Sequence, residues 1–161
     1  MKDKPTITKR YTNLPFGHRQ PNHDGHCRFI HGHNWAFEFE FDCDELEPKT
    51  GFVVDFGKLK AWKGKLEAAF DHTLVLNEDD PLAVLLEEAQ SRLAASIDVG
   101  KWLELVTVND CSCEGIAVHT FTELNEWLGN QNDLAMRGVR CIRCTVFEDD
   151  KNSATFCGVT S

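Results

Sequence analysis

Three histidines and one cysteine lie close together near the start of the chain. They are His18, Cys27, His31 and His33, within the stretch from Phe16 to Asp42. Neutral imidazole is a good zinc ligand, and a catalytic zinc usually has three protein ligands and one open position. The three histidines are therefore candidate zinc ligands, and Cys27 is either a fourth ligand or a reactive thiol. For His18 considered alone, a hydrogen-bonded structural role is the simpler alternative.

The residues after the histidine pair have the pattern of a strand that is buried on one face. Four aromatic side chains alternate with acidic or small ones over residues 35–42, and alternate residues share one face of a strand. Extending the alternation backwards places His31 and His33 on the aromatic face. We expect two adjacent imidazoles at the end of an apolar strip, with His18 supplied by a loop that follows a strand at 6–13.

The composition is ordinary for a soluble globular protein. Of 161 residues, 42% are hydrophobic and 27% are charged, which predicts one domain over residues 1–161. The sequence contains neither an apolar run of membrane-spanning length nor a signal-peptide pattern. Its seven cysteines cannot all form disulfides with one another, which favours a reducing compartment. We therefore expect a cytoplasmic protein. A formal net charge of −9 argues against nonspecific nucleic-acid binding.

Hydrophobic spacing predicts three helices and several further strands. Helices are expected at about 57–70, from the Asp80-Pro81 pair to just before Gly100, and from near Cys113 with Ser112 as cap. The run at 52–55 is the expected partner of the aromatic strand. Further strands are expected at 102–108 and 139–148, with a loop at 130–138.

Several other polar residues have both a structural and a functional interpretation. Asp71 and His72 follow a predicted helix, where a histidine is favourable in any case, yet a carboxylate-oriented imidazole is also a general acid or base. Glu114 falls in the first turn of a helix, which stabilises a carboxylate. Glu148 is the last residue on the apolar face of a predicted strand. It is either a solvated end residue or a ligand anchor directed into a pocket.

A second metal site built from cysteines receives little support from the spacing. The candidate pairs are Cys111 with Cys113 and Cys141 with Cys144. In a regular strand, residues three apart point to opposite faces, and no glycine or proline provides the tight turn that zinc knuckles use.

The motifs, in their order along the chain, resemble the 6-pyruvoyl-tetrahydropterin synthase / 6-carboxytetrahydropterin synthase family. The resemblance covers almost the whole chain and is far more specific than any single motif. It rests on Phe-Gly-His-Arg at 16–19, Cys27 four residues before His-Gly-His at 31–33, Thr-Gly-Phe-Val-Val-Asp-Phe at 50–56, Asp-His at 71–72 with a downstream Leu-Asn, Glu-x-x-Ala at 114–117, and a final strand that ends in Glu148.

The resemblance implies an α+β tunnelling fold, with an antiparallel four-stranded sheet that has helices on one face. An extra helix, near residues 81–97, would occupy an insertion. The family assembles as trimers that stack into hexamers, so the resemblance also implies a homohexamer with active sites between subunits.

The same resemblance implies a role for each candidate residue. His18, His31 and His33 would hold zinc, which binds the side-chain oxygens of 7,8-dihydroneopterin triphosphate and stabilises developing negative charge. Cys27 would be the base, and His72, oriented by Asp71, the second proton carrier. Glu148 and Glu114 would bind the pterin, with Glu148 also relaying to His72. Contacts to the triphosphate are assigned to Arg19 and Arg28, which flank the metal residues.

The implied activity is that of a zinc-dependent lyase. The first expectation is 6-carboxytetrahydropterin synthase in queuosine-precursor biosynthesis, with release of triphosphate and acetaldehyde. The alternatives are 6-pyruvoyl-tetrahydropterin synthase and an inactive zinc-binding homologue. The chain departs from the family's Pro-Thr-x-Glu-Asn pattern at residues 111–115, and either His23 or His26 could replace His18 as the third ligand.

Overall fold

The computed structural model of the protein describes residues 4–97 and 100–158. Residues 1–3, 98–99 and 159–161 of the predicted domain therefore lie outside the described residues. A six-stranded sheet runs through the structure in the order β4-β3-β1-β2-β5-β6. Its strands are β1 (Ile7–His18), β2 (His31–Asp42), β3 (Leu74–Asn77), β4 (Leu105–Val108), β5 (Arg140–Phe147) and β6 (Ser153–Cys157).

The expected antiparallel four-stranded sheet is present as β1, β2, β5 and β6, in which every neighbouring pair is antiparallel. The prediction of four strands was nevertheless too few. Two four-residue strands extend the sheet beyond β1, where β3 pairs parallel with β1 and β4 pairs parallel with β3. The sheet is therefore mixed.

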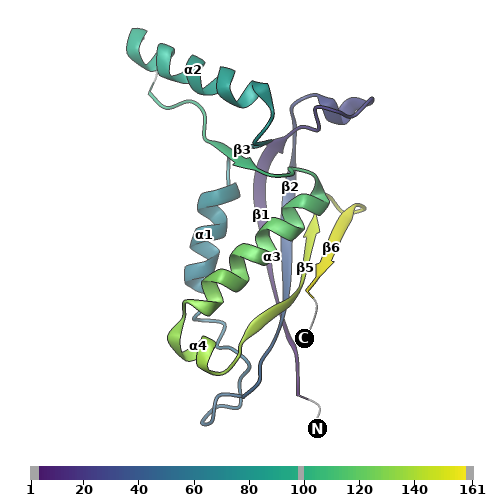
Figure 1. The fold of residues 1–161 in the computed structure, drawn as a ribbon, viewed down its shortest axis with the longest axis vertical. Helices are drawn as coiled ribbons and strands as arrows, with labels where there is room; N and C mark the ends of the chain where they lie inside the picture. The colour runs from purple at the N-terminus through teal and green to yellow at the C-terminus, as the bar shows by residue number, and fades with distance from the viewer. Residues whose placement is uncertain (1–3, 98–99, 159–161) are drawn as a thin grey trace.

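Helices α1 (Lys60–Phe70) and α3 (Cys113–Gly129) cover the same face of the sheet (Figure 1). The predicted helix spacing is confirmed for both, and Ser112 caps α3 by accepting a hydrogen bond from the N–H of Gly115. The predicted loop at 130–138 instead contains the short helix α4 (Asn132–Met136). Within the described part of the chain, no helix has both the length and the apolar character needed to cross a membrane.

The extra helix α2 (Pro81–Ser96) forms where the sequence predicts it, and it projects from one end of the sheet (Figure 1). Asp80 caps α2 by accepting from the N–H of Leu82, and Pro81 occupies the first turn, where its missing N–H costs nothing. Ala83 is the only buried residue of α2. The strand predicted over 102–108 is shorter than expected, because β4 begins at Leu105.

Strand β1 is longer than the predicted strand at 6–13, and His18 is its last residue rather than part of a loop. The β1–β2 register shifts between Tyr11 and Leu14, where Asn13 adopts a left-handed backbone with a φ of 62°. This bulge changes which residues face the core. Alternation along β1 is therefore broken in the sequence, and the strand's second half is hard to detect from the pattern.

The aromatic side of β2 forms the middle of the hydrophobic core, as its alternation predicts. Trp35, Phe37, Phe39 and Phe41 are all fully buried.

The prediction that residues 52–55 form the partner strand of β2 is wrong, because β5 occupies that side of the sheet. Val53 and Val54 are both buried, so this segment enters the core without alternating. The Arg137 guanidinium donates hydrogen bonds to the carbonyls of Phe52 and Val53, at 3.2 and 3.0 Å. A side chain thus satisfies backbone acceptors that a neighbouring strand would otherwise bind.

Candidate metal centre and its cleft

The β1–β2 ladder brings the three candidate histidines together. His18 is the Cα partner of His31, and His33 is the partner of Phe16, two residues earlier on β1. The ring centroid of His18 lies 4.5 Å from that of His31 and 5.6 Å from that of His33. Buried Trp35 packs edge-on against both His18 and His33, so one side of the histidine cluster contacts an apolar side chain.

Hydrogen bonds to backbone carbonyls orient two of the three imidazoles. His18 Nδ1 lies 2.9 Å from the carbonyl oxygen of Cys111, and His31 Nδ1 lies 2.8 Å from that of Phe29. A carbonyl can only accept, so in each ring Nδ1 carries the hydrogen and Nε2 keeps its lone pair. Burial lowers the pKa of His18, which favours the neutral imidazole that a metal requires.

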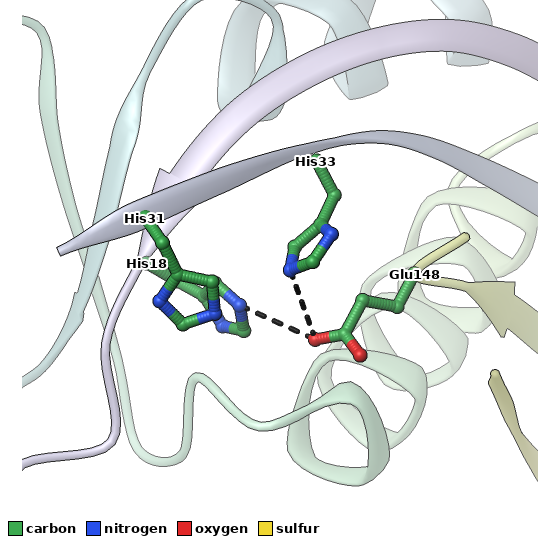
Figure 2. A group of neighbouring side chains, drawn as sticks. All are labelled: His18, His31, His33 and Glu148. Atoms are coloured by element: carbon green, nitrogen blue, oxygen red, sulfur yellow. Dashed lines mark ion pairs between the residues drawn. The ribbon is translucent and has the colours of Figure 1, made fainter. Parts of the chain in front are cut away.

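The free nitrogens converge on one point, together with the carboxylate of Glu148 (Figure 2). Glu148 Oε1 lies 3.3 Å from Nε2 of His18 and 3.6 Å from Nε2 of His33. Each of the four side chains offers an atom, and these atoms lie within 4.8 Å of one another. Nε2 of His18 and Nε2 of His33 are both buried, and neither atom has a hydrogen-bond partner. Their contacts with Glu148 lack hydrogen-bond geometry.

This donor set fits a divalent metal ion. Three imidazole nitrogens and one carboxylate oxygen are ligands that zinc accepts, and an ion would satisfy the two unpartnered buried nitrogens. Within residues 4–97 and 100–158, this is the one group of histidine, cysteine, aspartate and glutamate side chains close enough to share an ion. Neither His23 nor His26 belongs to it.

Two members of the metal-binding group, His18 and Glu148, line a cleft of about 440 Å³, whereas His31 and His33 do not line it. Cys27 enters it from the short 3-10 helix η1 (His26–Arg28), and Glu114 from the first turn of α3. Cys27, Glu114, His18 and Glu148 were all predicted from the sequence as site residues, and all four line the same cleft. Cleft residues that it did not assign are Gln20, Ser112, Cys113, Lys151, Asn152 and Ser153.

The two thiols of the cleft differ in their surroundings. Cys27 is exposed. Burial raises the pKa of Cys113 to about 11, and its Sγ donates to the carbonyl of Val146. Cys113 is therefore a protonated structural thiol at neutral pH, whereas Cys27 is open to a ligand in the cleft.

Asp71 and His72 do not line the cleft of their own chain. Asp71 Oδ1 accepts a hydrogen bond from His72 Nδ1 at 2.7 Å, and the His72 side chain is 80% exposed. His72 has a left-handed backbone with a φ of 58°, and its N–H donates to the carbonyl of Pro15. The chain thus presents an oriented imidazole outward, in a conformation that costs energy for a non-glycine residue.

The two arginines assigned to the triphosphate also lie outside the set of cleft-lining residues. Arg19 binds Asp80 through two hydrogen bonds of 2.6 and 2.7 Å. The Arg28 guanidinium packs over the ring of Phe29, 4.9 Å from its centroid. Lys151 is the lysine that lines the cleft, and it lies three residues after Glu148 in the turn before β6.

The chain is similar to known proteins along nearly its full length. Residues 6–158 match the family model described as 6-pyruvoyl tetrahydropterin synthase. The 6-carboxy-5,6,7,8-tetrahydropterin synthase of Rickettsia typhi is 31% identical over 123 residues, which cover 71% of this chain and 77% of that protein. The corresponding enzyme of Rickettsia conorii is 38% identical over 65 residues, covering 40% of this chain and 46% of that protein.

Solved structures share the fold at lower sequence identity. An uncharacterized protein from Wolinella succinogenes superposes with a TM-score of 0.78 at 20% identity, covering 96% of this chain and 98% of that one. The 6-pyruvoyl tetrahydropterin synthase of Caenorhabditis elegans superposes with a TM-score of 0.59 at 20% identity, covering 99% and 100%. The tunnelling fold and the family match agree, and the chain belongs to the 6-pyruvoyl tetrahydropterin synthase family.

Proposed function

We propose that this protein is a zinc-dependent 6-carboxy-5,6,7,8-tetrahydropterin synthase that acts on 7,8-dihydroneopterin triphosphate. The products would be 6-carboxytetrahydropterin, acetaldehyde and triphosphate, and atom balance requires one water. The observation that carries the proposal is the convergence of His18, His31, His33 and Glu148 at a cleft that also contains the Cys27 thiol. The names of the Rickettsia relatives support the choice of product.

His18, His31 and His33 would hold the zinc ion, because their Nε2 atoms face one point and the Nδ1 atoms of His18 and His31 are engaged elsewhere. Bound zinc supplies Lewis-acid chemistry, which stabilises negative charge that develops on a substrate oxygen. Trp35 beneath the rings limits water on that side and keeps the imidazoles in place.

Cys27 would act as the base that removes a proton from the substrate side chain. Its thiol is exposed and enters the same cleft as His18. The thiolate is the basic and nucleophilic form of cysteine, and a position open to the substrate suits this role.

His72, oriented by Asp71, would be the second proton carrier and would act in the cleft of a neighbouring copy. Its exposed side chain and its position outside its own cleft support this assignment. The assembly we propose is a homohexamer built as a dimer of trimers, in which each active site uses residues from two chains.

Glu148 and Glu114 would recognise the pterin ring. A carboxylate accepts two parallel N–H bonds from a 2-amino group and the adjacent ring nitrogen, and such charge-assisted bonds are strong. Glu148 lies between the histidines and the open cleft, where it could also relay a proton to His72. Arg19 and Arg28 remain the predicted contacts to the triphosphate.

The protein would work in the cytoplasm, in the formation of a queuosine precursor. All seven cysteines are free thiols, which supports a reducing compartment.

The test is incubation of the zinc-loaded protein with 7,8-dihydroneopterin triphosphate, followed by product identification by mass and an enzymatic assay for acetaldehyde. We expect 6-carboxytetrahydropterin and stoichiometric acetaldehyde. A product that keeps its three-carbon side chain would instead identify a 6-pyruvoyl-tetrahydropterin synthase. No turnover by a protein that holds one zinc per chain would identify a zinc-binding homologue without lyase activity.

A His31→Ala variant tests the metal assignment in the same experiment. We expect its zinc content to fall close to zero, because one of three ligands is removed. His23→Ala is the matched control, since His23 lines the cleft but lies outside the metal-binding group. Loss of zinc from His23→Ala with retention in His31→Ala would contradict the assignment.

A further inference from the structure

We propose that Asn77 and Cys111 are positioning residues for the metal ligand His18, and that they set its tautomer through the Cys111 peptide. The inference rests on the zinc site of the proposed function. It gives a role to two residues that the reaction itself does not use: the asparagine at the end of β3 and a cysteine first considered as a metal ligand.

The Cys111 carbonyl is the group that orients His18. It accepts from His18 Nδ1 at 2.9 Å, so the ring can present only Nε2 to an ion. Cys111 lies between the end of β4 and the start of α3. Neither a strand ladder nor a helix fixes its peptide, and other contacts must hold the carbonyl in place.

Asn77 supplies the first of these contacts. Its Oδ1 accepts a hydrogen bond from the backbone N–H of Cys111 at 2.8 Å. The asparagine is the last residue of β3 and is anchored there by pairing with Val108 of β4. A rigid strand end therefore fixes the N–H of a residue whose carbonyl fixes His18.

The Cys111 side chain supplies the second contact. Its Sγ is fully buried and donates to the carbonyl of Arg19, the residue after His18, at 2.9 Å. Arg19 is in turn held by the buried Asp80 carboxylate. Cys111 thus holds the end of β1 at two successive residues, and its thiol is a hydrogen-bond donor rather than a metal ligand.

The experiment measures zinc affinity of the full chain by competition with a chromophoric chelator, without substrate. Asn77→Ala removes the acceptor for the Cys111 N–H, and Asn77→Asp keeps an acceptor oxygen at that position. We expect zinc to bind about 10- to 100-fold more weakly to Asn77→Ala, as is typical for the loss of an outer hydrogen-bond partner. Asn77→Asp should stay within about threefold of the unmodified protein.

The chain offers a matched control for general destabilisation. Asn125 Oδ1 accepts from the backbone N–H of Cys141 at 2.9 Å, which is the same type of contact between α3 and β5. Asn125→Ala should lower the melting temperature at least as much as Asn77→Ala, because Asn125 Nδ2 also donates to the carbonyls of Phe121 and Cys141. Its zinc affinity should be unchanged. The absorption spectrum of the cobalt-loaded protein should shift in Asn77→Ala only.

A second pair of variants tests the thiol. Cys111→Ala loses the donor to the Arg19 carbonyl, and Cys111→Ser keeps one. We expect weaker zinc binding in Cys111→Ala and recovery of most of the affinity in Cys111→Ser.

Two results would overturn the inference. One is a zinc affinity in Asn77→Ala that equals that of the unmodified protein. The other is a loss of zinc affinity in Asn125→Ala as large as the loss in Asn77→Ala. The proposed lyase activity can fail while this result stands, because the affinity is measured without substrate. If the unmodified protein itself binds no zinc, both proposals fall together.

Discussion

The carboxylate of Glu148 faces the imidazole of His18, with 3.3 Å between Oε1 and Nε2. The two residues are far apart in the sequence and lie at the ends of β5 and β1, with β2 between these strands. This position allows two roles, because a carboxylate there can complete the coordination of an ion or bind a substrate that approaches it.

Glu148→Gln separates these roles. If Glu148 anchors the pterin, zinc affinity should change by less than about threefold, while kcat/KM should fall about 10- to 100-fold through loss of charged hydrogen bonds. Zinc affinity and steady-state kinetics are measured on the same preparation. A large loss of zinc with unchanged KM would make Glu148 a metal ligand instead.

Cys27→Ala should abolish most turnover without affecting the metal. Removal of a positioned base commonly costs about 10²- to 10⁴-fold in rate, and Cys27 does not belong to the metal-binding group. Activity and zinc content are the measurements. Cys157→Ala, which removes the other exposed cysteine, is the control and should remain fully active. Unchanged turnover in Cys27→Ala would exclude Cys27 as the base.

Mixing two inactive variants tests whether active sites are shared between chains. Cys27→Ala and His72→Ala should each have little activity. After joint refolding in equal amounts, about a quarter of the sites should combine an intact Cys27 with an intact His72 from another chain. We therefore expect activity near that fraction of the unmodified protein. No recovery in demonstrably mixed oligomers would mean that His72 does not act across the boundary.

The Arg19–Asp80 pair should make stability depend on pH. Arg19 holds the pKa of Asp80 below its ordinary value of 3.8. Because the folded pKa is the lower one, the pair stabilises the protein at pH values above the unfolded pKa. This stabilisation is lost as the pH falls through the folded value.

Asp80→Asn should therefore lower the free energy of unfolding by about 2 to 4 kcal/mol at pH 7 and by much less near pH 2. Asparagine still caps a helix, so the effect reports the ion pair rather than the cap of α2. Denaturant titrations at several pH values measure it. Glu67→Gln breaks an exposed pair with Lys63 and should change stability by less than about 1 kcal/mol. An equal loss for Asp80→Asn at both pH values would contradict the prediction.

The sequence predicted the parts of the fold that depend on local periodicity. Burial on one face leaves a hydrophobic period of two or 3.6 residues. This period made it possible to predict the aromatic strand β2, the helices α1, α2 and α3, and the caps at Asp80 and Ser112. His31 and His33 were placed correctly for the same reason, since both continue the alternation of Trp35.

Other features have no periodic signal in the sequence. The bulge at Asn13 concealed the second half of β1, and with it the strand position of His18. The 52–55 segment was mistaken for a strand because its apolar run is short, while the contacts that satisfy its backbone come from distant Arg137. The parallel pairing of β3 with β1 depends on contacts between segments far apart in the chain.

The sequence by itself determined the chemical identity of the site: which imidazoles, which thiol and which carboxylates are available, and the order of motifs that marks the family. Only the tertiary structure decided which of them meet. His18 joins His31 because two strands pair in one register, and Glu148 joins them across β2. Cys111 supports His18 although 93 residues separate them. Such contacts follow from packing and strand register, which the local sequence pattern does not specify.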